Sequence, residues 1–489
     1  MFSMYKSIQQ FCESGIINLD NICAGFFEDP ENIAGFVNGV KNEVLRFACA
    51  YISDAFEEMD AQIRQSPLRA NDWVIVRRDT KPMLTSIGEI RFQKTMYKHR
   101  RSGERTYLLD RMLGIEEGSR MTEDAEAQML EEAVQTSYRK GGEAASILEG
   151  ISKGTVKNRL HELQFPKAEE SEEKKQVEYL YIDADEDRVA LQFFEKKGDI
   201  KPGADGRKYN DVQVKLVYVY EGIEPESPGS GRYRLVNPHY FSGVYEEKDN
   251  EKLWEEVAEY IEGKYDLEQV RKIYLNADGG GWIKGIHRKI LSVTEVLDEY
   301  HLNKYLTQMT SHLYDSADEG KLILRDSIRG DTKAAFRKEV ERIRGYAEGK
   351  DLKRIEEGEE YITNNWRAAK IRLQKKAGVI GSSTEGHISH VLASRMSSRP
   401  LGWCKTGADR MGKLRAYYWN DGDMLELVRY QKEARKKEKR EKKYPFSAEI
   451  IRSCNRQHVP NGKYYDRMQH SIPAQTRKTL AIRYHLMLN

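Results

Sequence analysis

The sequence predicts a mixed α/β protein, and three observations carry this prediction. Residues 1–70 have a mostly helical pattern, as in VKNEVLRFACAYISDAFEEMDAQI. From residue 177 onward, three β-rich runs, an amphipathic helix and another short β-rich run follow one another. Residues 307–376 are almost all charged helix, which indicates a helical insertion and not part of a sheet.

Size and composition limit the possible classes of protein. A chain of 489 residues predicts several domains. The 80 basic and 78 acidic residues nearly cancel, so any nucleic-acid surface has to be local. The five cysteines are scattered without a C-x-x-C pair, which argues against a disulfide framework or a cysteine zinc site. No apolar run is long enough for a membrane span, and the N-terminal residues lack a signal-peptide pattern, so we expect no membrane contact.

Residues 1–135 are predicted to form an N-terminal helical and small β region. Its β part, residues 71–113, is rich in arginine and lysine beside Tyr97 and Tyr107.

Residues 136–172 are predicted to contain a helix-turn-helix followed by an acidic linker. The first helix would end near Leu148, residues 149–151 would form the turn, and Ser152 would cap the second helix. An ordinary helical hairpin gives the same pattern, and Gly141–Gly142 weakens the first helix. The side chains that would face a DNA groove are Lys153, Thr155, Lys157 and Asn158.

The order strand-strand-strand-helix-strand is that of the ribonuclease H-like fold. We therefore expect a ribonuclease H-like catalytic domain with a helical insertion, preceded by the N-terminal region and its helix-turn-helix. The predicted parts are residues 173–306 and 378–430 for the catalytic domain, 307–377 for the insertion and 431–489 for a basic C-terminal tail.

Acidic residues of this domain lie where a metal site can be built. Asp183 and Asp185 are two positions apart and so share one face of a strand. Asp278 ends a later strand, just before GGGW, and Glu385 lies in the first turn of a helix after a glycine-serine loop. Carboxylates on separate rigid elements can hold the two Mg²⁺ ions that activate the attacking and leaving oxygens in DNA cleavage.

Each acidic residue also has an ordinary structural explanation. An aspartate at a strand end commonly forms a turn, and residues 183–187 are compatible with a solvated strand end. SSTE is also a capping box, with Ser382 as the cap and Glu385 bonding back to it. Other chemistries have less support, because the triple glycine is not followed by Lys-Ser/Thr and no G-x-S-x-G is present.

Four ordered motifs carry a family resemblance: LYIDADEDRVALQ, YLNADGGGWIKG, VLDEYHLNKYL and SSTEGHISHVLASRMSSRPLGW. They resemble the motifs of bacterial insertion-sequence transposases of the DDE type, in the Mutator-like branch and its ISLre-type family. The resemblance spans about residues 75–420 and implies that Asp278 and Glu385 are the second and third catalytic acids. The first is Asp185, in the ADED core, or Asp183, whose spacing to Val189 fits more distant Mutator-like relatives better.

The resemblance also implies partners and accessory residues. Asp298 and His301 resemble the D-x-x-H pair of that branch, and their spacing places them on one helix face, although a helix-start aspartate beside an unrelated histidine gives the same spacing. The implied cofactor is Mg²⁺ or Mn²⁺, and the implied partner is double-stranded DNA, both the terminal inverted repeats and the target. Arg395 and Arg399 would contact backbone phosphates, and the chain would form a homo-oligomer on DNA.

The function expected from the sequence is metal-dependent cleavage at the ends of an insertion sequence, followed by strand transfer into target DNA. Such a protein would be cytoplasmic and nucleoid-associated. Two alternatives remain open: a ribonuclease H-like nuclease without strand transfer, and a DNA-binding regulator whose acidic residues are structural.

Overall fold

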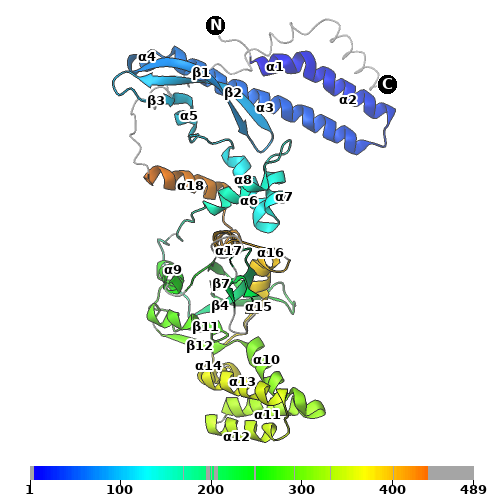
Figure 1. Cartoon of the computed structure of the whole chain (residues 1–489), viewed down its shortest axis with the longest axis vertical. Coiled ribbons are helices and arrows are strands. Elements are labelled where there is room, and N and C mark those ends of the chain that lie inside the picture. Colours follow the sequence, from blue (N-terminus) through cyan, green and yellow to red (C-terminus); the bar gives the residue numbers. More distant parts are fainter. Residues whose placement is uncertain are drawn as a thin grey trace. The chain divides into compact units, whose positions relative to one another are not determined.

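The protein is described by a computed structural model (Figure 1). Two compact units divide the chain: residues 1–133, 137–156 and 424–489 form the first, and residues 134–136 and 157–423 form the second. No helix in the described part of the chain is long and apolar enough to cross a membrane. The described residues are 5–168, 170–193, 199, 201–202, 208–246, 249–290, 292–330, 332–399 and 401–438.

The first unit combines long N-terminal helices with an antiparallel sheet of order β1-β2-β3. The strands lie in the segment whose β character the sequence predicts: β1 (Trp73–Leu84), β2 (Glu89–His99) and β3 (Arg105–Tyr107). The helices of this unit are α1 (Lys6–Gln10), the π-helix η1 (Phe11–Gly15), α2 (Ile16–Glu28), α3 (Ile33–Gln65), α4 (Pro67–Asp72), α5 (Leu108–Leu113), α7 (Tyr138–Ala144) and α18 (Met424–Glu438). Two further helices are divided between the units: α6 (Glu123–Gln135) belongs to the first unit up to Ala133, and α8 (Lys153–His161) up to Val156.

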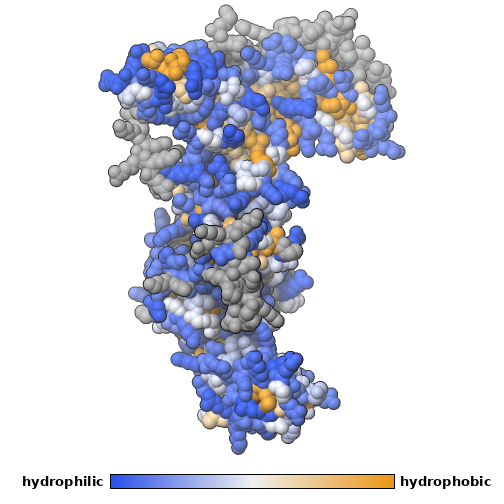
Figure 2. Space-filling view, viewed as in Figure 1, coloured by the Kyte–Doolittle hydropathy of each residue, from blue (hydrophilic) through white to orange (hydrophobic). Residues whose placement is uncertain are grey.

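The sheet of this unit is held to α3 by apolar packing and by one buried carboxylate. Ile63 of α3 and Trp73, Phe92 and Tyr97 of the strands belong to one core cluster. Asp60 of α3 is fully buried, and it accepts hydrogen bonds from the backbone nitrogen and the hydroxyl of Thr95, at 2.8 and 2.7 Å. These bonds offset the cost of burying the charge. By contrast, part of the apolar surface of α2 and α3 stays exposed, at residues such as Phe27 (63%), and Figure 2 shows hydrophobic residues gathered over this helical pair.

The helix-turn-helix segment contains two short helices, and the prediction of where the first one ends was wrong. α7 ends at Ala144, not near Leu148, and residues 145–152 are not helical. Backbone hydrogen bonds explain the early end, because the nitrogen of Ile147 donates to Ser86 and that of Ile151 donates to Gly142, each at 2.9 Å. A Cβ on Gly142 would lie 2.4 Å from the Ile151 carbonyl oxygen, so this close approach requires glycine. As predicted, the Ser152 hydroxyl caps α8 by accepting from the Thr155 nitrogen.

The predicted basic tail begins within α18, where the described side chains are engaged. Lys432 pairs with Glu123 and Arg435 with Glu116. This start of the basic block is therefore docked on acidic residues of its own unit and does not form a free arm. Residues 439–489, the rest of the predicted tail, lie outside the described residues.

The second unit is built on a five-stranded mixed sheet of order β10-β7-β4-β11-β12. β4 is antiparallel to β7 and parallel to β11, and β11 is parallel to β12. β7 lies inside the sheet, and its buried run from Val214 to Tyr220 is typical of a strand covered on both faces. The strands are β4 (Tyr179–Ala190), β7 (Asp211–Tyr220), β10 (His239–Gly243), β11 (Lys272–Ala277) and β12 (Val293–Leu297), beside the small ladders β5 (Lys201–Pro202) with β6 (Lys208–Tyr209) and β8 (Gly222–Pro225) with β9 (Tyr233–Val236).

The alternating residues of β4 face two different layers. Leu180, Ile182 and Ala184 share a core cluster with residues of α9 (Asn250–Lys264), which covers one face of the sheet (Figure 1). Tyr181, Asp183, Asp185 and Asp187 point to the other face. Tyr181 donates to the carbonyl of Gly378 at 2.8 Å, so the segment that leads into the C-terminal helices covers this face.

Helices between β12 and that segment form a layer with its own core, as the charged helical pattern predicts. Leu302, Leu324, Phe336, Ile355 and Ala369 belong to this cluster. The helices are α10 (Glu299–Thr310), the 3₁₀ turn η4 (Ser311–Ser316), α11 (Ala317–Gly330), α12 (Lys333–Arg344), α13 (Lys350–Asn364) and α14 (Trp366–Gln374). The remaining helical segments of the unit are the 3₁₀ turn η3 (Ile283–Arg288), α15 (Thr384–His387), the π-helix η5 (Ile388–Ala393), α16 (Ser394–Met396) and α17 (Lys405–Trp419).

Candidate metal and phosphoryl-transfer site

Asp183 is a buried structural carboxylate. Its side chain is fully inaccessible and accepts four hydrogen bonds, from Tyr218 (2.8 Å), Tyr220 (3.1 Å), Asn276 (2.6 Å) and Thr384 (3.2 Å). Burial raises its pKa to about 6, although the four bonds favour the charged form. With its oxygens engaged inside the core, Asp183 is poorly placed to bind a metal ion.

Arg372 of α14 extends this buried network to the helical layer. Its guanidinium donates to the side-chain oxygen of Asn276 at 2.6 Å, and Asn276 in turn donates to Asp183. The same guanidinium donates to the carbonyls of Leu297, at 2.8 Å, and Ile380, at 2.5 Å. One side chain thus joins β11, the end of β12 and the segment that leads to α15.

Asp185 lies two residues after Asp183 on the same face of β4 and is only partly buried. Burial raises the pKa of Asp185 to about 7, and the charge of Asp278 adds to this rise. The backbone hydrogen bond from Glu186 and the charge of His301 act in the opposite direction. Asp185 therefore interacts with Asp278, the residue just after β11. Since β4 and β11 are parallel neighbours and Ala277 lies opposite Ala184, this register places Asp278 beside Asp185.

Asp278 forms the turn that its position after a strand predicts, and its charge acts on Asp185. Its Oδ1 accepts the backbone N–H of Gly280 at 2.8 Å, and its carbonyl accepts the hydroxyl of Tyr361 at 2.6 Å. Gly279 has φ = +87°, and a Cβ there would lie 2.4 Å from the Asn365 side-chain oxygen, so the first glycine of the triplet is required by geometry. The turn aims the aspartate and at the same time ties it to α13.

His301 and Asp298 form the predicted pair beside these two aspartates. Asp298 caps α10 by accepting from the backbone nitrogen of His301, and its Oδ2 lies 3.2 Å from His301 Nδ1. The hydrogen bond to Asp298 raises the pKa of His301, and the charges of Asp278 and Asp185 add to this rise. Burial acts to raise the pKa of Asp298, but the hydrogen bonds from His301 and Ser382 outweigh burial and hold this pKa below its ordinary value. The histidine thus favours its cationic form close to the paired aspartates.

Glu385 is exposed in the first turn of α15, and the capping-box alternative is wrong. The cap residue of α15 is Ser383, which makes no side-chain cap bond, and the Ser382 hydroxyl donates to Asp298 at 2.5 Å. Glu385 acts on Asp187, whose pKa is raised by burial and further by the charge of Glu385. The third predicted acid therefore reaches the carboxylate face of β4, at a position two residues beyond Asp185.

A π-helical turn follows Glu385 directly, and Arg415 stabilises it. Residues Ile388–Ala393 form η5, a geometry that breaks the regular helical hydrogen-bond pattern. The buried guanidinium of Arg415 in α17 donates to the carbonyls of Val391, at 2.5 Å, and His390. The π-helical segment that follows α15, the helix of Glu385, thus has internal donors for two of its carbonyls.

The donor set fits a hard divalent cation without forming a closed cage. In the described part of the chain, no group of three or more His, Cys, Asp or Glu side chains is close enough to hold a metal ion. Mg²⁺ is usually held by one or two carboxylates, waters and substrate phosphates, so the pair Asp185 and Asp278 is sufficient for such a site. Burial is the main cause of the raised pKa of Asp185 and the charge of Asp278 adds to it, so a bound cation would favour the ionised form of this carboxyl.

Comparison with known proteins shows the family. The family model described as an uncharacterised protein family, UPF0236, matches residues 28–436. The chain belongs to this family. A UPF0236 protein of Caldanaerobacter subterraneus subsp. tengcongensis is 36% identical over 397 residues, which cover 81% of this chain and 80% of the relative. Another from the same strain is 36% identical over 408 residues, covering 83% and 82% of the two chains.

The residues predicted to contact DNA differ in their exposure. Lys153, Thr155, Lys157 and Asn158 are all exposed on α8. Arg399 is exposed as well, but Arg395 is only 4% exposed and its guanidinium lies 5.0 Å from the ring centre of Trp403. This placement argues against a phosphate contact by Arg395.

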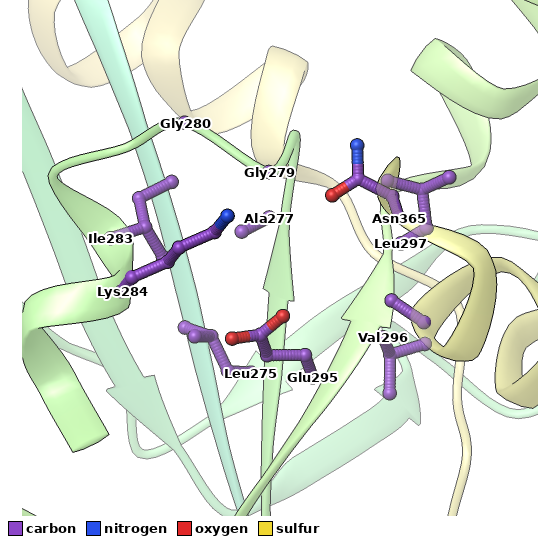
Figure 3. Close-up of a pocket in the computed structure, with 11 residues that line it drawn as sticks. Leu275, Ala277, Gly279, Gly280, Ile283, Lys284, Glu295, Val296, Leu297 and Asn365 are labelled. Carbon is purple, nitrogen blue, oxygen red and sulfur yellow. The ribbon is translucent and has the colours of Figure 1, made fainter. Parts of the chain in front are cut away.

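A small pocket beside the Gly279 turn offers no second metal site. Figure 3 shows the side chains of Lys284 and Glu295 pointing into it from an otherwise mostly apolar lining that includes Leu275 and Leu297. Glu295 is the only carboxylate of this lining, and it lies 2.6 Å from His287 Nε2. The carboxylate pair on β4 and β11 remains the better candidate.

We expect Asp185→Asn to stabilise the protein at pH 8 in the presence of EDTA and to have little effect at pH 4. The pKa of Asp185 is raised from 3.8 to about 7 in the folded state, so the cost of ionising this carboxyl is complete above pH 7 and disappears as the pH falls toward 3.8. Each kcal/mol relieved should raise the melting temperature by about 2–4 °C. Thermal unfolding beside the exposed control Asp318→Asn checks this, and an equal shift at both pH values would contradict it.

Proposed function

We propose that this protein is a DNA transposase of the bacterial insertion-sequence DDE type. It would cleave DNA at the ends of its element in a metal-dependent step and then join the freed 3′ end to target DNA. The observation that carries the proposal is the register of two parallel strands, which places Asp278, just after β11, beside Asp185 of β4. The charge of Glu385 acts on Asp187, on the same face of β4.

The strand order supports a ribonuclease H-like interpretation of the second unit. Numbered along the chain, the strands of the main sheet lie in the order third, second, first, fourth, fifth, and the second is antiparallel to the first. The helices α10–α14 occupy the place that the resemblance implies for an insertion before the final glutamate. The same order places β4 and β11 side by side, as is required if Asp185 and Asp278 are to hold one cation together.

The proposed roles follow from where each side chain lies. Asp185 and Asp278 would hold the cation, and Glu385 would complete the site when DNA is bound. Mg²⁺ or Mn²⁺, when bound, would supply activation of the attacking oxygen and offset the charge on the phosphate. His301 has its Nδ1 directed at Asp298, so Nε2 is the nitrogen available to donate to a phosphate oxygen.

The names of the relatives add independent support. One UPF0236 relative bears a name that joins eleven gene designations of a single strain, and another joins four. Several gene copies under one protein name are what repeated transposition within a genome would leave.

The segment of α7 and α8 is proposed as the reader of the terminal repeats. The exposed residues of α8 and its capped start are compatible with a recognition helix in a major groove. Arg399 is the better candidate of the two arginines for a phosphate contact, since it is exposed. Assembly of more than one copy on the paired DNA ends is part of the same proposal.

Two other functions would leave different products. A ribonuclease H-like nuclease would nick DNA but would give no joined strands. A DNA-binding regulator would bind equally well with and without divalent metal and would cleave nothing. A strand-transfer assay on the DNA that flanks the reading frame separates all three.

Asp278→Asn should abolish cleavage and strand transfer while folding and DNA binding persist. The amide can still accept from Gly280 in the turn, but it lacks the charge that Mg²⁺ requires. We expect a rate loss of several orders of magnitude beside an unchanged Asp318→Asn control. Normal Mg²⁺-dependent cleavage by the Asp278→Asn protein would remove this residue from the site.

Replacing both Lys153 and Lys157 with alanine should weaken binding to the terminal repeat. Each lost phosphate contact lowers the slope of log K against log salt by about 0.9. Because both side chains are exposed, thermal stability should not change. Fluorescence anisotropy over a salt series measures the slope, and unchanged affinity and slope would exclude α8 from DNA binding.

A further inference from the structure

The hairpin between β2 and β3 concentrates positive charge that the fold does not neutralise. Lys98 of β2 lies directly opposite Arg105 of β3 in the antiparallel register. Both side chains are exposed, as are Arg100 and Arg101 in the connecting turn. Like charges directly opposite each other on neighbouring strands destabilise a sheet, so this arrangement has an energetic cost within the free protein.

Nearby carboxylates do not relieve that cost. Glu104, within the hairpin, pairs with Arg111 at 2.5 Å. Within the part of the chain that the structure describes, Lys98, Arg101 and Arg105 form no ion pair, and the side chain of Arg100 donates to the backbone carbonyl of Ala70, at 3.3 Å. These four residues, which we call the hairpin cluster, therefore lack an internal counter-charge.

The turn that carries the hairpin cluster is held in one conformation. His99 donates its backbone N–H to Glu104 at 2.8 Å, and its ring accepts from the backbone of Ser102 at 3.1 Å and packs against Trp73. Gly103 takes the left-handed conformation with φ = +74°, and its backbone nitrogen donates to His99. The backbone nitrogen of Arg100 donates to Asp72 of α4, at 2.7 Å.

A rigid turn presents its cations without a large loss of conformational entropy on binding. The chemistry of the cluster favours a polyanion over an apolar protein surface. The centres of protein interfaces are depleted in charged residues, whereas DNA interfaces are strongly positive. A two-stranded β-ribbon also has the dimensions to approach a groove of B-DNA.

We propose that the hairpin cluster, Lys98, Arg100, Arg101 and Arg105, is a second DNA-binding surface that contacts backbone phosphates independently of α8. This inference rests on the proposed function for the identity of its partner. A transposase has to hold target DNA as well as its own ends, and a surface that binds phosphates without reading bases suits a target of any sequence.

The test replaces all four residues with glutamine in the full chain. DNA affinity is measured by anisotropy on a random-sequence duplex over a salt series. Loss of four phosphate contacts should lower the slope of log K against log salt by about 3–4. The melting temperature should stay the same or rise, because the repulsion between Lys98 and Arg105 is removed. A matched control replaces the exposed Lys304, Lys338, Lys350 and Lys353 with glutamine, which changes the net charge by the same amount. In this control the slope of log K against log salt should change by less than about one.

The outcomes separate this inference from the proposed function. An unchanged slope in the hairpin variant, while the unmodified protein binds DNA, would overturn the hairpin inference alone. Cleavage by the Asp278→Asn protein would count against the proposed catalytic site but would leave the hairpin result standing. If polyglutamate competes with DNA as well as an equal charge of unlabelled duplex, the cluster is a general polyanion site and the assignment to DNA is wrong.

Discussion

The carboxylate of Asp183 is the constraint on which the architecture of the second unit depends. A fully buried charge costs several kcal/mol unless hydrogen bonds surround it. Here the donors come from β7, β11 and the start of α15, and Thr384 is 201 positions from Asp183 along the chain. Arg372 extends the network to the helical layer. The network therefore requires the sheet, the helices α10–α14 and the helix that carries Glu385 to come together before the charge is compensated.

Asp183, Asp185 and Asp187 lie on the same face of β4 because side chains alternate along a strand, but their surroundings differ. Asp183 is enclosed, while Asp185 and Asp187 follow on the same face toward the end of the strand, where Asp278 and Glu385 interact with them. The cost of holding these acidic groups near one another is offset in part by His301. A bound divalent cation would complete this offset, which is why we propose that the site takes a ligand from outside the chain.

Much of this arrangement could be predicted from local sequence, and the limits have physical causes. The succession of strands and helices along the chain was predictable because hydrophobic periodicity is local, and so was the position of Asp278 at the end of a strand before three glycines. The choice between Asp183 and Asp185 could not be predicted, because both lie on the same face of β4. Contacts with the distant Thr384 and, through Asn276, Arg372 determine that Asp183 is the enclosed one. Residues that the sequence did not single out, such as Asp187 and Arg415, act through contacts with α15 and η5. The early end of α7 likewise depends on backbone hydrogen bonds from Ile147 to Ser86 and from Ile151 to Gly142.

The central claim is that Asp185 and Asp278 together bind a divalent cation. Fe²⁺ can replace Mg²⁺ at such sites, and with ascorbate and peroxide it cuts the backbone next to where it is bound. Mass spectrometry of the fragments should place the cuts beside residues 183–187 and 277–280, and excess Mg²⁺ should suppress them. Cuts elsewhere in the chain, or the same cuts in a protein that lacks both carboxylates, would contradict the assignment.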